Sequence, residues 1–230
     1  MNTAEKAEQL KQVTQKMEQD VEKLPLVKEA KEVVPSEGNP DAQIMFIGEA
    51  AGYHEYVQRR PFVGLAGKLL TKTLEEVGLR RQEVFIANML RCRPPNNRDP
   101  LPEEIAAYAP YLDAEIDIIE PKIIATLGRF SMGKFLPLVK ISQVHGQPRW
   151  VDWPASPNRG EKGKKILIMP LYHPAAALRS TQLLNTFKAD FAKLPQLLNT
   201  LNGTPAHESK PTTESKPEEP QNQQLSLIWN

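Results

Sequence analysis

Four short segments of the sequence carry residues of types that can bind a ligand or take part in its chemistry. The first, Gly48-Glu49-Ala50-Ala51-Gly52, combines a carboxylate with two glycines, where the backbone can approach a ligand closely. In the second, Phe62 lies between Pro61 and Gly64 and offers a flat face for stacking. The third begins at Asn88, whose amide can both donate and accept hydrogen bonds at the end of an apolar run.

The fourth segment is Tyr172-His173-Pro174-Ala175-Ala176, in which His173 follows an expected strand and precedes an expected helix. The positive end of a helix dipole lowers the pKa of an imidazole, and a neutral imidazole suits contact with an electron-rich atom. Each segment also has a purely structural interpretation: a tight turn at the glycines, a core Phe62, a turn-capping Asn88 and a helix-capping His173.

Hydrophobic periodicity predicts the elements that position these segments. Strands are expected at 43–48, 83–88, 123–127 and 165–171, and helices at 4–24, 67–77, 102–119, 128–136 and from Pro174 to about residue 198. Their alternation predicts an α/β protein, a three-layer α/β/α fold with a central, mainly parallel sheet of about four strands. Loops at the carboxyl ends of the strands, which begin at Gly48, Asn88, Gly128 and His173, should then carry the chemistry.

Composition narrows the class of protein. Lys and Arg number 29 against 28 Asp and Glu, so the net charge is +1 and a uniformly basic nucleic-acid binder is excluded. Cys92 is the single cysteine, so neither an intrachain disulfide nor a four-thiolate metal site can form within one chain. No apolar run is long enough to span a membrane or to serve as a signal peptide, and we expect a cytoplasmic monomer.

The C-terminal residues differ from the rest of the chain. Residues 203–223 contain no large apolar side chain, and this composition predicts a disordered linker after a catalytic domain at 1–202. Apolar residues return at 224–230, in Gln224-Leu225-Ser226-Leu227-Ile228-Trp229.

Taken in order, the motifs resemble those of the uracil-DNA glycosylase superfamily, most closely its family 4. The matching motifs are Gly-Glu-Ala-x-Gly, Arg-Pro-Phe-Val-Gly-x-Ala-Gly, an Asn at a strand end, Cys-Arg-Pro-Pro-x-Asn-Arg and Tyr-His-Pro-Ala-Ala, over roughly residues 15–200. The resemblance implies an enzyme that flips uracil out of DNA and hydrolyses its N-glycosidic bond to start base excision repair.

The resemblance also implies roles for the site residues. Phe62 would stack on the uracil, Asn88 would bond its polar edge, and His173 would bond a carbonyl oxygen as the base leaves as an anion. Glu49 would position water or substrate, with Glu55 as a second carboxylate in reach or a solvent-facing charge. Backbone amides of the first loop, at Gly48, Ala50 and Gly52, complete the implied substrate-binding set.

A local rim of DNA-contacting side chains is expected around the motif loops, with solubility as the alternative interpretation of its charges. Its members are Arg59, Arg60, Arg91, Arg93 and Arg179, with Leu178 as the candidate wedge into the base stack. Three departures from the family pattern lie in these loops: Ala51 replaces the usual Pro of the first motif, Arg59 replaces a usual Gly, and Ala177, before Leu178, stands where the family often has Leu.

The largest departure concerns iron. Family 4 enzymes typically hold a four-iron, four-sulfur cluster on four cysteines, and the matching positions here are Val21, Leu24, Cys92 and Tyr108. One thiolate cannot hold such a cluster, so we expect no cofactor. Val21, Leu24 and Tyr108 should instead fill the volume around Cys92 as a small core.

The last residues resemble the pentapeptide by which bacterial proteins bind the sliding clamp. Gln224, Leu225 and Leu227 match it, Ile228 stands in for Phe, and Trp229 can supply an aromatic ring. The alternative is a short strand or helix that folds back on the domain.

Two other functions stay open. One is a catalytically weak DNA-binding or uracil-sensing member of the family, tethered to the clamp. The other is a Rossmann-like nucleotide or phosphate-ester hydrolase, which the absence of a Gly-x-x-x-x-Gly-Lys-Ser/Thr loop and of an aspartate cluster at the strand ends disfavours.

Overall fold

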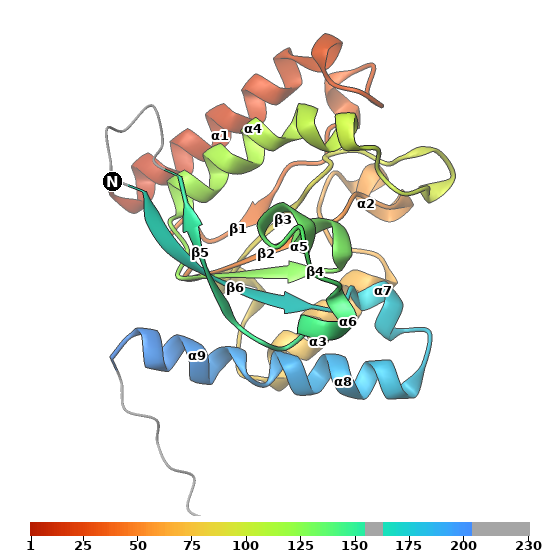
Figure 1. Cartoon of the computed structure of the whole chain (residues 1–230). Helices are drawn as coiled ribbons and strands as arrows, with labels where there is room; N and C mark the ends of the chain where they lie inside the picture. The colour runs from red at the N-terminus through yellow and green to blue at the C-terminus, as the bar shows by residue number, and fades with distance from the viewer. Residues whose placement is uncertain (155–162, 204–230) are drawn as a thin grey trace, which may run out of the picture.

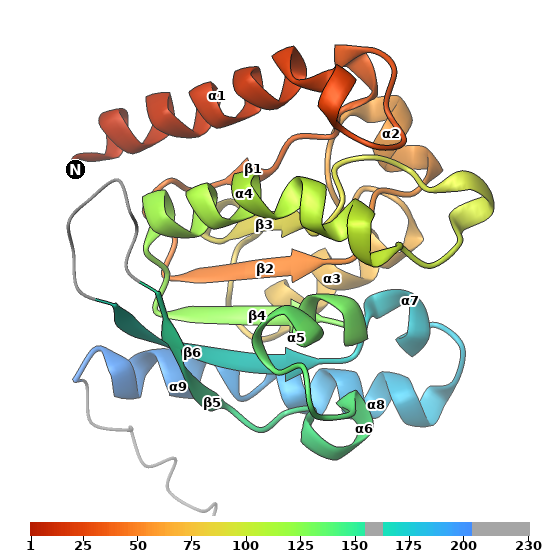
Figure 2. The same ribbon diagram turned by 45° about the horizontal axis from the view of Figure 1, so that its top comes forward.

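A computed structural model describes residues 1–154 and 163–203 of the chain, and in this part a six-stranded sheet lies between two layers of helices (Figures 1 and 2). The strand order is β1-β3-β2-β4-β6-β5. The strands are β1 (Glu37–Gly38), β2 (Ile44–Gly48), β3 (Phe85–Asn88), β4 (Ile123–Leu127), β5 (Arg149–Trp153) and β6 (Lys164–Leu171).

The four expected strands are β2, β3, β4 and β6, and they pair in parallel. The expected α/β/α architecture and mainly parallel sheet are therefore confirmed. The sheet is larger than expected, because β1 and β5 pair antiparallel at its two edges. Alternate side chains of β2 enter opposite cores: Met45 and Ile47 on one face, and Ile44 and Phe46 on the other.

The first helical layer consists of α1 (Thr3–Gln19), α4 (Pro102–Ile119) and α5 (Arg129–Phe135). Figure 2 shows α1 and α4 running side by side over this face of the sheet. Met17 from α1 packs with Leu112 and Ile116 from α4 in one buried cluster. The helix expected at 4–24 ends at Gln19, and a short 3-10 turn, η1 (Val21–Lys23), follows it.

The second layer consists of α3 (Leu65–Glu76), α8 (Thr181–Phe191) and α9 (Leu194–Leu201) (Figure 1). Phe191 stacks on Phe46 of β2 with ring centroids 5.7 Å apart. The single helix expected from Pro174 is instead three: α7 (Pro174–Ala177), α8 and α9. The break between α7 and α8 lies at Ser180, because its side chain caps the start of α8 by accepting a hydrogen bond from the Leu183 amide.

Two short helices that the sequence pattern does not predict lie in loops, α2 (Tyr53–Gln58) after β2 and α6 (Ile141–Val144) before β5. Four 3-10 turns complete the described elements: η1, η2 (Ala30–Glu32), η3 (Arg81–Glu83) and η4 (Pro95–Asn97). None of the helices in the described ranges is long and apolar enough to cross a membrane. The expected linker, apart from Gly203, and the expected tail at 224–230 lie outside the described residues.

Candidate active site

A cavity of about 790 Å³ lies where the parallel strands end. Its walls include Glu49 after β2, Asn88 at the end of β3, Gly128 after β4 and His173 after β6, together with Phe62 from the loop before α3. The structure thus brings together all four segments that the sequence singles out. In Figure 1 these strand ends point toward α2 and α7.

Asn88 lies at the floor of this cavity and is only 3% exposed. Its Oδ1 atom has no hydrogen-bond partner among the described residues. Gly48 permits this arrangement, since a Cβ atom there would lie 2.3 Å from Asn88 Oδ1 and 2.4 Å from Phe62 Cζ. A buried acceptor without a partner is costly, so the site suits a ligand that donates a hydrogen bond to it.

Phe62 is 6% exposed, and its ring lies 5.8 Å from that of His173, centroid to centroid. It both packs in the second core and lines the cavity, so its structural and functional interpretations hold together. Glu55 holds its loop: the carboxylate accepts hydrogen bonds from the amides of Val63 and Gly64, both at 2.8 Å. Glu55 is therefore a loop-binding group rather than a solvent-facing charge.

His173 is both a helix cap and a cavity residue. Its Nδ1 accepts a hydrogen bond from the Ala175 amide at 3.2 Å, at the start of α7. Burial lowers the pKa of the imidazole to about 4, with an opposing effect from the Glu55 carboxylate. The ring is therefore neutral at pH 7, and because Nδ1 is the acceptor, Nε2 carries the proton and can donate to a ligand.

Glu49 lies in the wall of the cavity, half-buried. Burial raises the pKa of its carboxyl group, the Asp99 carboxylate raises it further, and the Arg129 guanidinium opposes this. Backbone hydrogen bonds join its loop to the one after β3: Leu90 N donates to Glu49 O at 2.9 Å, and Ala51 N donates to Cys92 O at 3.2 Å. The Ala51 bond holds the loop where family members have Pro, a residue without an N–H group.

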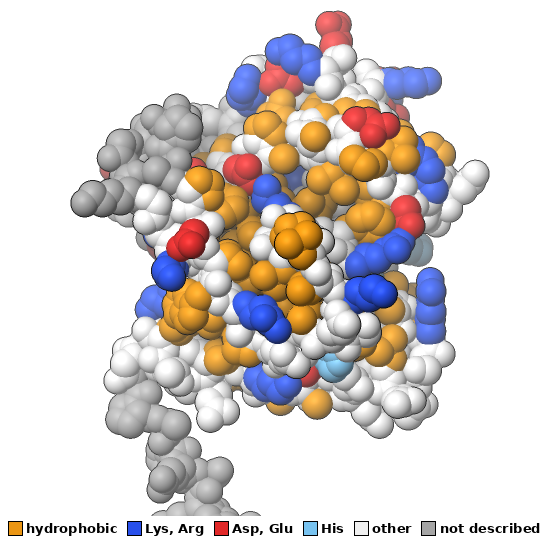
Figure 3. All heavy atoms as spheres, viewed as in Figure 1, with side chains coloured by type: hydrophobic (Ala, Val, Ile, Leu, Met, Phe, Trp, Pro, Cys, Tyr) orange, Lys and Arg blue, Asp and Glu red, His pale blue; other side chains and the backbone are white. Residues whose placement is uncertain are grey.

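The expected DNA-contacting rim separates into three groups. Arg179 lines the cavity, Leu178 beside it is 50% exposed, and the Arg93 guanidinium lies over the Tyr53 ring at 5.4 Å. Arg59 and Arg60 have their charges paired, with Glu18 and Glu37 respectively. In Figure 3 basic side chains are scattered over one face, with several toward the side where α2 and α7 lie.

The expectation for Arg91 is wrong. Its side chain is 1% exposed, and it forms a buried ion pair with Glu115 and a hydrogen bond to Ser36. A charge that leaves water is stabilised by such partners, and the guanidinium here serves the core between β3 and α4 rather than a phosphate. Glu115 is 24 residues away in the chain, so no local pattern announces the pair.

Two further features of the site have no counterpart in the sequence reasoning. Tyr53, 58% exposed, stands at the cavity mouth at the start of α2. Its position directly after Gly52 is the only signal that could have drawn attention to it. Arg81, on η3, contacts the loop of Phe62 and donates a hydrogen bond to Phe62 O.

The residues around Cys92 do not fit an iron–sulfur cluster. The chain supplies one thiol, and burial raises the pKa of that thiol to about 11, which keeps it protonated at neutral pH. The Tyr108 hydroxyl lies 3.3 Å from Cys92 Sγ and donates to Pro25 O at 2.8 Å. Leu24 is buried in the same cluster and Val21 packs against it, as expected.

Comparisons with known proteins agree with this geometry. The family model described as "Uracil DNA glycosylase superfamily" matches residues 35–199. A type-4 uracil-DNA glycosylase of Sulfurisphaera tokodaii is 48% identical over 172 residues, 71% of this chain and 74% of that relative. One from Saccharolobus solfataricus is 45% identical over 184 residues, 77% and 82% of the two chains. A type-5 uracil-DNA glycosylase of Thermus thermophilus is 34% identical over 118 residues, 45% and 53%.

Proposed function

The chain belongs to the uracil-DNA glycosylase superfamily, to its type 4 branch, and from this premise we propose that it hydrolyses the N-glycosidic bond of uracil in DNA. The observation that carries the proposal is the cavity, in which an aromatic ring, an unpartnered amide oxygen and a neutral imidazole converge. Removal of the base leaves an abasic site, the starting point of base excision repair.

Base recognition would use Phe62 and Asn88. The deoxyuridine must leave the helical stack, because its glycosidic carbon is out of reach inside a duplex. The Phe62 ring offers a stacking face, and Asn88 Oδ1 lacks a donor that the N3–H group of uracil can supply. Cytosine has an unprotonated N3 at that position and leaves the buried oxygen unsatisfied, which supports discrimination between the two bases.

Departure of the base would use His173. Cleavage of the bond between C1′ and N1 leaves the electron pair on the base, whose carbonyl oxygens then carry negative charge. A proton on Nε2 of a neutral imidazole donates to such an oxygen more strongly as the charge develops. Water supplies the new oxygen on C1′, and its proton goes to the departing base or to solvent.

Positioning of that water is assigned to Glu49, with the loop amides at Gly48, Ala50 and Gly52 beside it. The support is that Glu49 and Ala50 line the cavity and that their loop is tied to the loop after β3. Because the pKa of Glu49 is raised by burial, its carboxyl group ionises at higher pH than an ordinary glutamate, and its help to the water should be lost earlier as the solution is acidified.

DNA contacts are assigned to the rim. Within the described residues, Arg93 and Arg179 have no carboxylate partner, so they are better phosphate ligands than the paired Arg59 and Arg60. Leu178 is the proposed wedge, because an exposed leucine next to Arg179, which lines the cavity, can fill the gap that a flipped nucleotide leaves. We further propose that the enzyme works as a cytoplasmic monomer.

We propose that this member of the family folds and acts without an iron–sulfur cluster. The support is the donor set: one protonated thiol, with Val21, Leu24 and Tyr108 at the other three positions. None of the assigned roles in base recognition or bond cleavage depends on such a cluster.

The proposed protein partner is a bacterial sliding clamp, bound by Gln224, Leu225, Leu227, Ile228 and Trp229. These residues lie outside the described part of the chain, and the proposal rests on the motif and on its place after a polar segment. Deletion of 224–230 should abolish clamp binding and leave excision from short oligonucleotides unchanged. A 220–230 peptide without affinity for any bacterial clamp would contradict the proposal.

The decisive assay of the function uses oligonucleotides with one uracil, cytosine, hypoxanthine or mispaired thymine, in single-stranded and duplex form. Abasic sites are revealed by alkaline cleavage. We expect strand breaks at uracil and none at cytosine. Tight binding of uracil DNA without abasic sites would favour the catalytically weak alternative, and release of phosphate from nucleotides would favour the hydrolase.

A further inference from the structure

The backbone of Phe62 has an unusual conformation. Its φ angle is +51°, in the left-handed region that bulky side chains rarely occupy. Such a conformation persists only where surrounding contacts enforce it. In this protein it directs the ring toward the cavity between Gly48 and His173.

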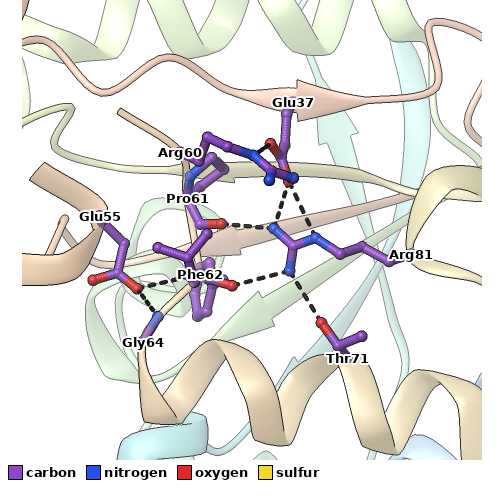
Figure 4. A network of polar contacts seen from close by, with 9 residues as sticks. Glu37, Glu55, Arg60, Pro61, Phe62, Gly64, Thr71 and Arg81 are labelled. Atoms are coloured by element: carbon purple, nitrogen blue, oxygen red, sulfur yellow. Dashed lines mark hydrogen bonds and ion pairs between the residues drawn. The ribbon is translucent and has the colours of Figure 1, made fainter. Parts of the chain in front are cut away.

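Arg81 holds the carbonyl side of this segment (Figure 4). Its guanidinium donates to Pro61 O at 2.6 Å, to Phe62 O at 3.1 Å and to Thr71 Oγ1 on α3 at 3.3 Å. The fork of donors on an arginine suits two consecutive carbonyl groups, and an ammonium group offers no such fork.

Glu37 orients Arg81 in turn. One carboxylate oxygen accepts from Arg81 Nε at 3.1 Å and from Nη2 at 2.6 Å, and the other accepts from Arg60 Nε at 2.7 Å. The side chains of Arg81 and Glu37 are 18% and 25% exposed, so the pair is partly shielded from water and from salt.

The amide side of the same segment is held by Glu55, through Val63 N and Gly64 N. Figure 4 shows Arg81 and Glu55 on opposite sides of the loop, with the Phe62 ring between them. Helix α3 packs directly below, since a Cβ atom at Gly67 would lie 1.9 Å from Phe62 O. The hydrogen bonds to Arg81 and Glu55 and the contact with α3 together fix the backbone conformation of Phe62.

We propose that Arg81, oriented by Glu37, is a positioning residue for uracil excision: it acts through Phe62, whose ring it holds in the stacking position, and never touches the base. The inference deepens the proposed function, since it specifies how the stacking face of that site is set. It predicts that loss of the guanidinium fork weakens recognition of the base by the same route as loss of the ring.

The test is a double-mutant cycle between Arg81→Gln and Phe62→Ala, measured as kcat/KM for uracil excision. Contacting residues couple, and we expect Arg81→Gln alone to lower kcat/KM about tenfold or more, but less than about threefold in the Phe62→Ala background. Arg81→Lys should fall between wild type and Arg81→Gln, because it keeps the charge and loses the fork. Multiplicative losses in the double variant, or wild-type excision by Arg81→Gln, would overturn the inference.

The matched control is Arg80→Gln. Arg80 precedes Arg81 in the chain, and its exposed guanidinium pairs with Glu83 rather than with the Phe62 loop. We expect excision within about twofold of wild type for this surface change. A loss equal to that of Arg81→Gln would reveal a general effect on η3 and would overturn the assignment to Arg81.

A readout without catalysis separates this inference from the proposed function. Amide hydrogen exchange at Val63 and Gly64 should speed up in Arg81→Gln and in Glu37→Gln, but not in Arg80→Gln, because only the first two loosen the clamp. Unchanged exchange in both variants would overturn the inference even in an active enzyme. Faster exchange in these variants of a protein that shows no excision would support the role of Arg81 in holding the Phe62 loop and would refute the glycosylase proposal instead. If Arg81→Gln does not fold, Arg81→Lys and Glu37→Gln carry both measurements.

Discussion

Asn88 and Cys92 lie close together in the chain but differ in whether their buried polar atoms have partners within the protein. Asn88 ends β3 in the cavity, and its amide oxygen has no partner in the described structure. Cys92, four residues later, is 1% exposed and lies against the Tyr108 hydroxyl and the Pro25 carbonyl. The cavity thus offers hydrogen bonds to a ligand, and the Cys92 region has its own protein partners.

This difference indicates that the cavity at Asn88 serves substrate binding and that the Cys92 region serves the packing of the fold. A buried group without a partner lowers stability unless a ligand satisfies it, so one that also lines a cavity, as Asn88 Oδ1 does, points to the place where a substrate binds. At positions where family 4 typically has cysteines, this chain has apolar or hydrogen-bonded side chains that pack as a core. If the two sites are independent, changes at one should affect catalysis and changes at the other only stability.

The largest effect is expected from Asn88→Ala and His173→Ala. Loss of one hydrogen bond that forms to the departing base commonly lowers kcat by about 10²–10³-fold, and we expect this for each variant. Single-turnover excision measures it, with thermal unfolding to show that the variants fold. Asn185→Ala, a change of an exposed asparagine on α8, is the control. Wild-type rates in folded Asn88→Ala or His173→Ala would contradict the assigned roles.

The second effect is a pH dependence of stability that arises from His173. Its pKa is about 4 in the folded protein and near 6.5 in the unfolded chain, so the unfolded state binds more protons between these values. The free energy of unfolding should therefore fall as pH decreases from 6.5 to 4, by at most about 3 kcal/mol from this residue. Denaturant unfolding of wild type and His173→Asn at pH 7 and pH 4.5 checks it. An equal pH dependence in both would contradict the burial of a neutral ring.

A third prediction concerns the stacking face. Phe62→Ala should weaken binding of free uracil by about 1–3 kcal/mol, the usual contribution of one base–aromatic stack. Titration calorimetry with uracil measures it. Unchanged affinity would mean that the ring is only part of the core, the structural interpretation of its burial.

The smallest effect is expected from a change in the Cys92 region. Cys92→Ala removes a small buried side chain that no assigned catalytic role uses, and it should cost about 1–2 kcal/mol of stability. Excision should be unchanged once the variant is folded. A loss of excision comparable to that of Asn88→Ala would join the two sites and refute their independence.

Local patterns account for much of the fold. Strand β4 is predictable at its observed bounds, because Ile123–Leu127 is apolar apart from Thr126 and lies between Pro121 and Gly128. Strand β5 is not predictable in this way, because Arg149–Trp153 lies at a sheet edge and most of its side chains are exposed. Its strand character comes from pairing with β6 rather than from its own hydrophobicity.

The site divides along the same line. Asn88 and His173 are predictable because Asn88 ends one apolar strand and His173 lies two residues after another, at the carboxyl ends where parallel sheets place their ligands. The burial of Arg91 and the clamp of Arg81 are not, because each depends on a carboxylate distant in sequence, Glu115 and Glu37. The sequence shows that an arginine lies near a motif. Only the tertiary structure shows whether its guanidinium faces solvent or pairs with a buried carboxylate.

We propose that this protein removes uracil and does so without an iron–sulfur cluster, and one preparation can test both the excision and the absence of the cluster. Protein purified under anaerobic conditions is assayed for abasic-site formation on uracil DNA, and iron is quantified in the same sample by elemental analysis. We expect excision at an iron content far below one atom per chain. Stoichiometric iron with a visible thiolate–iron absorbance, or excision that appears only after cluster reconstitution, would contradict it.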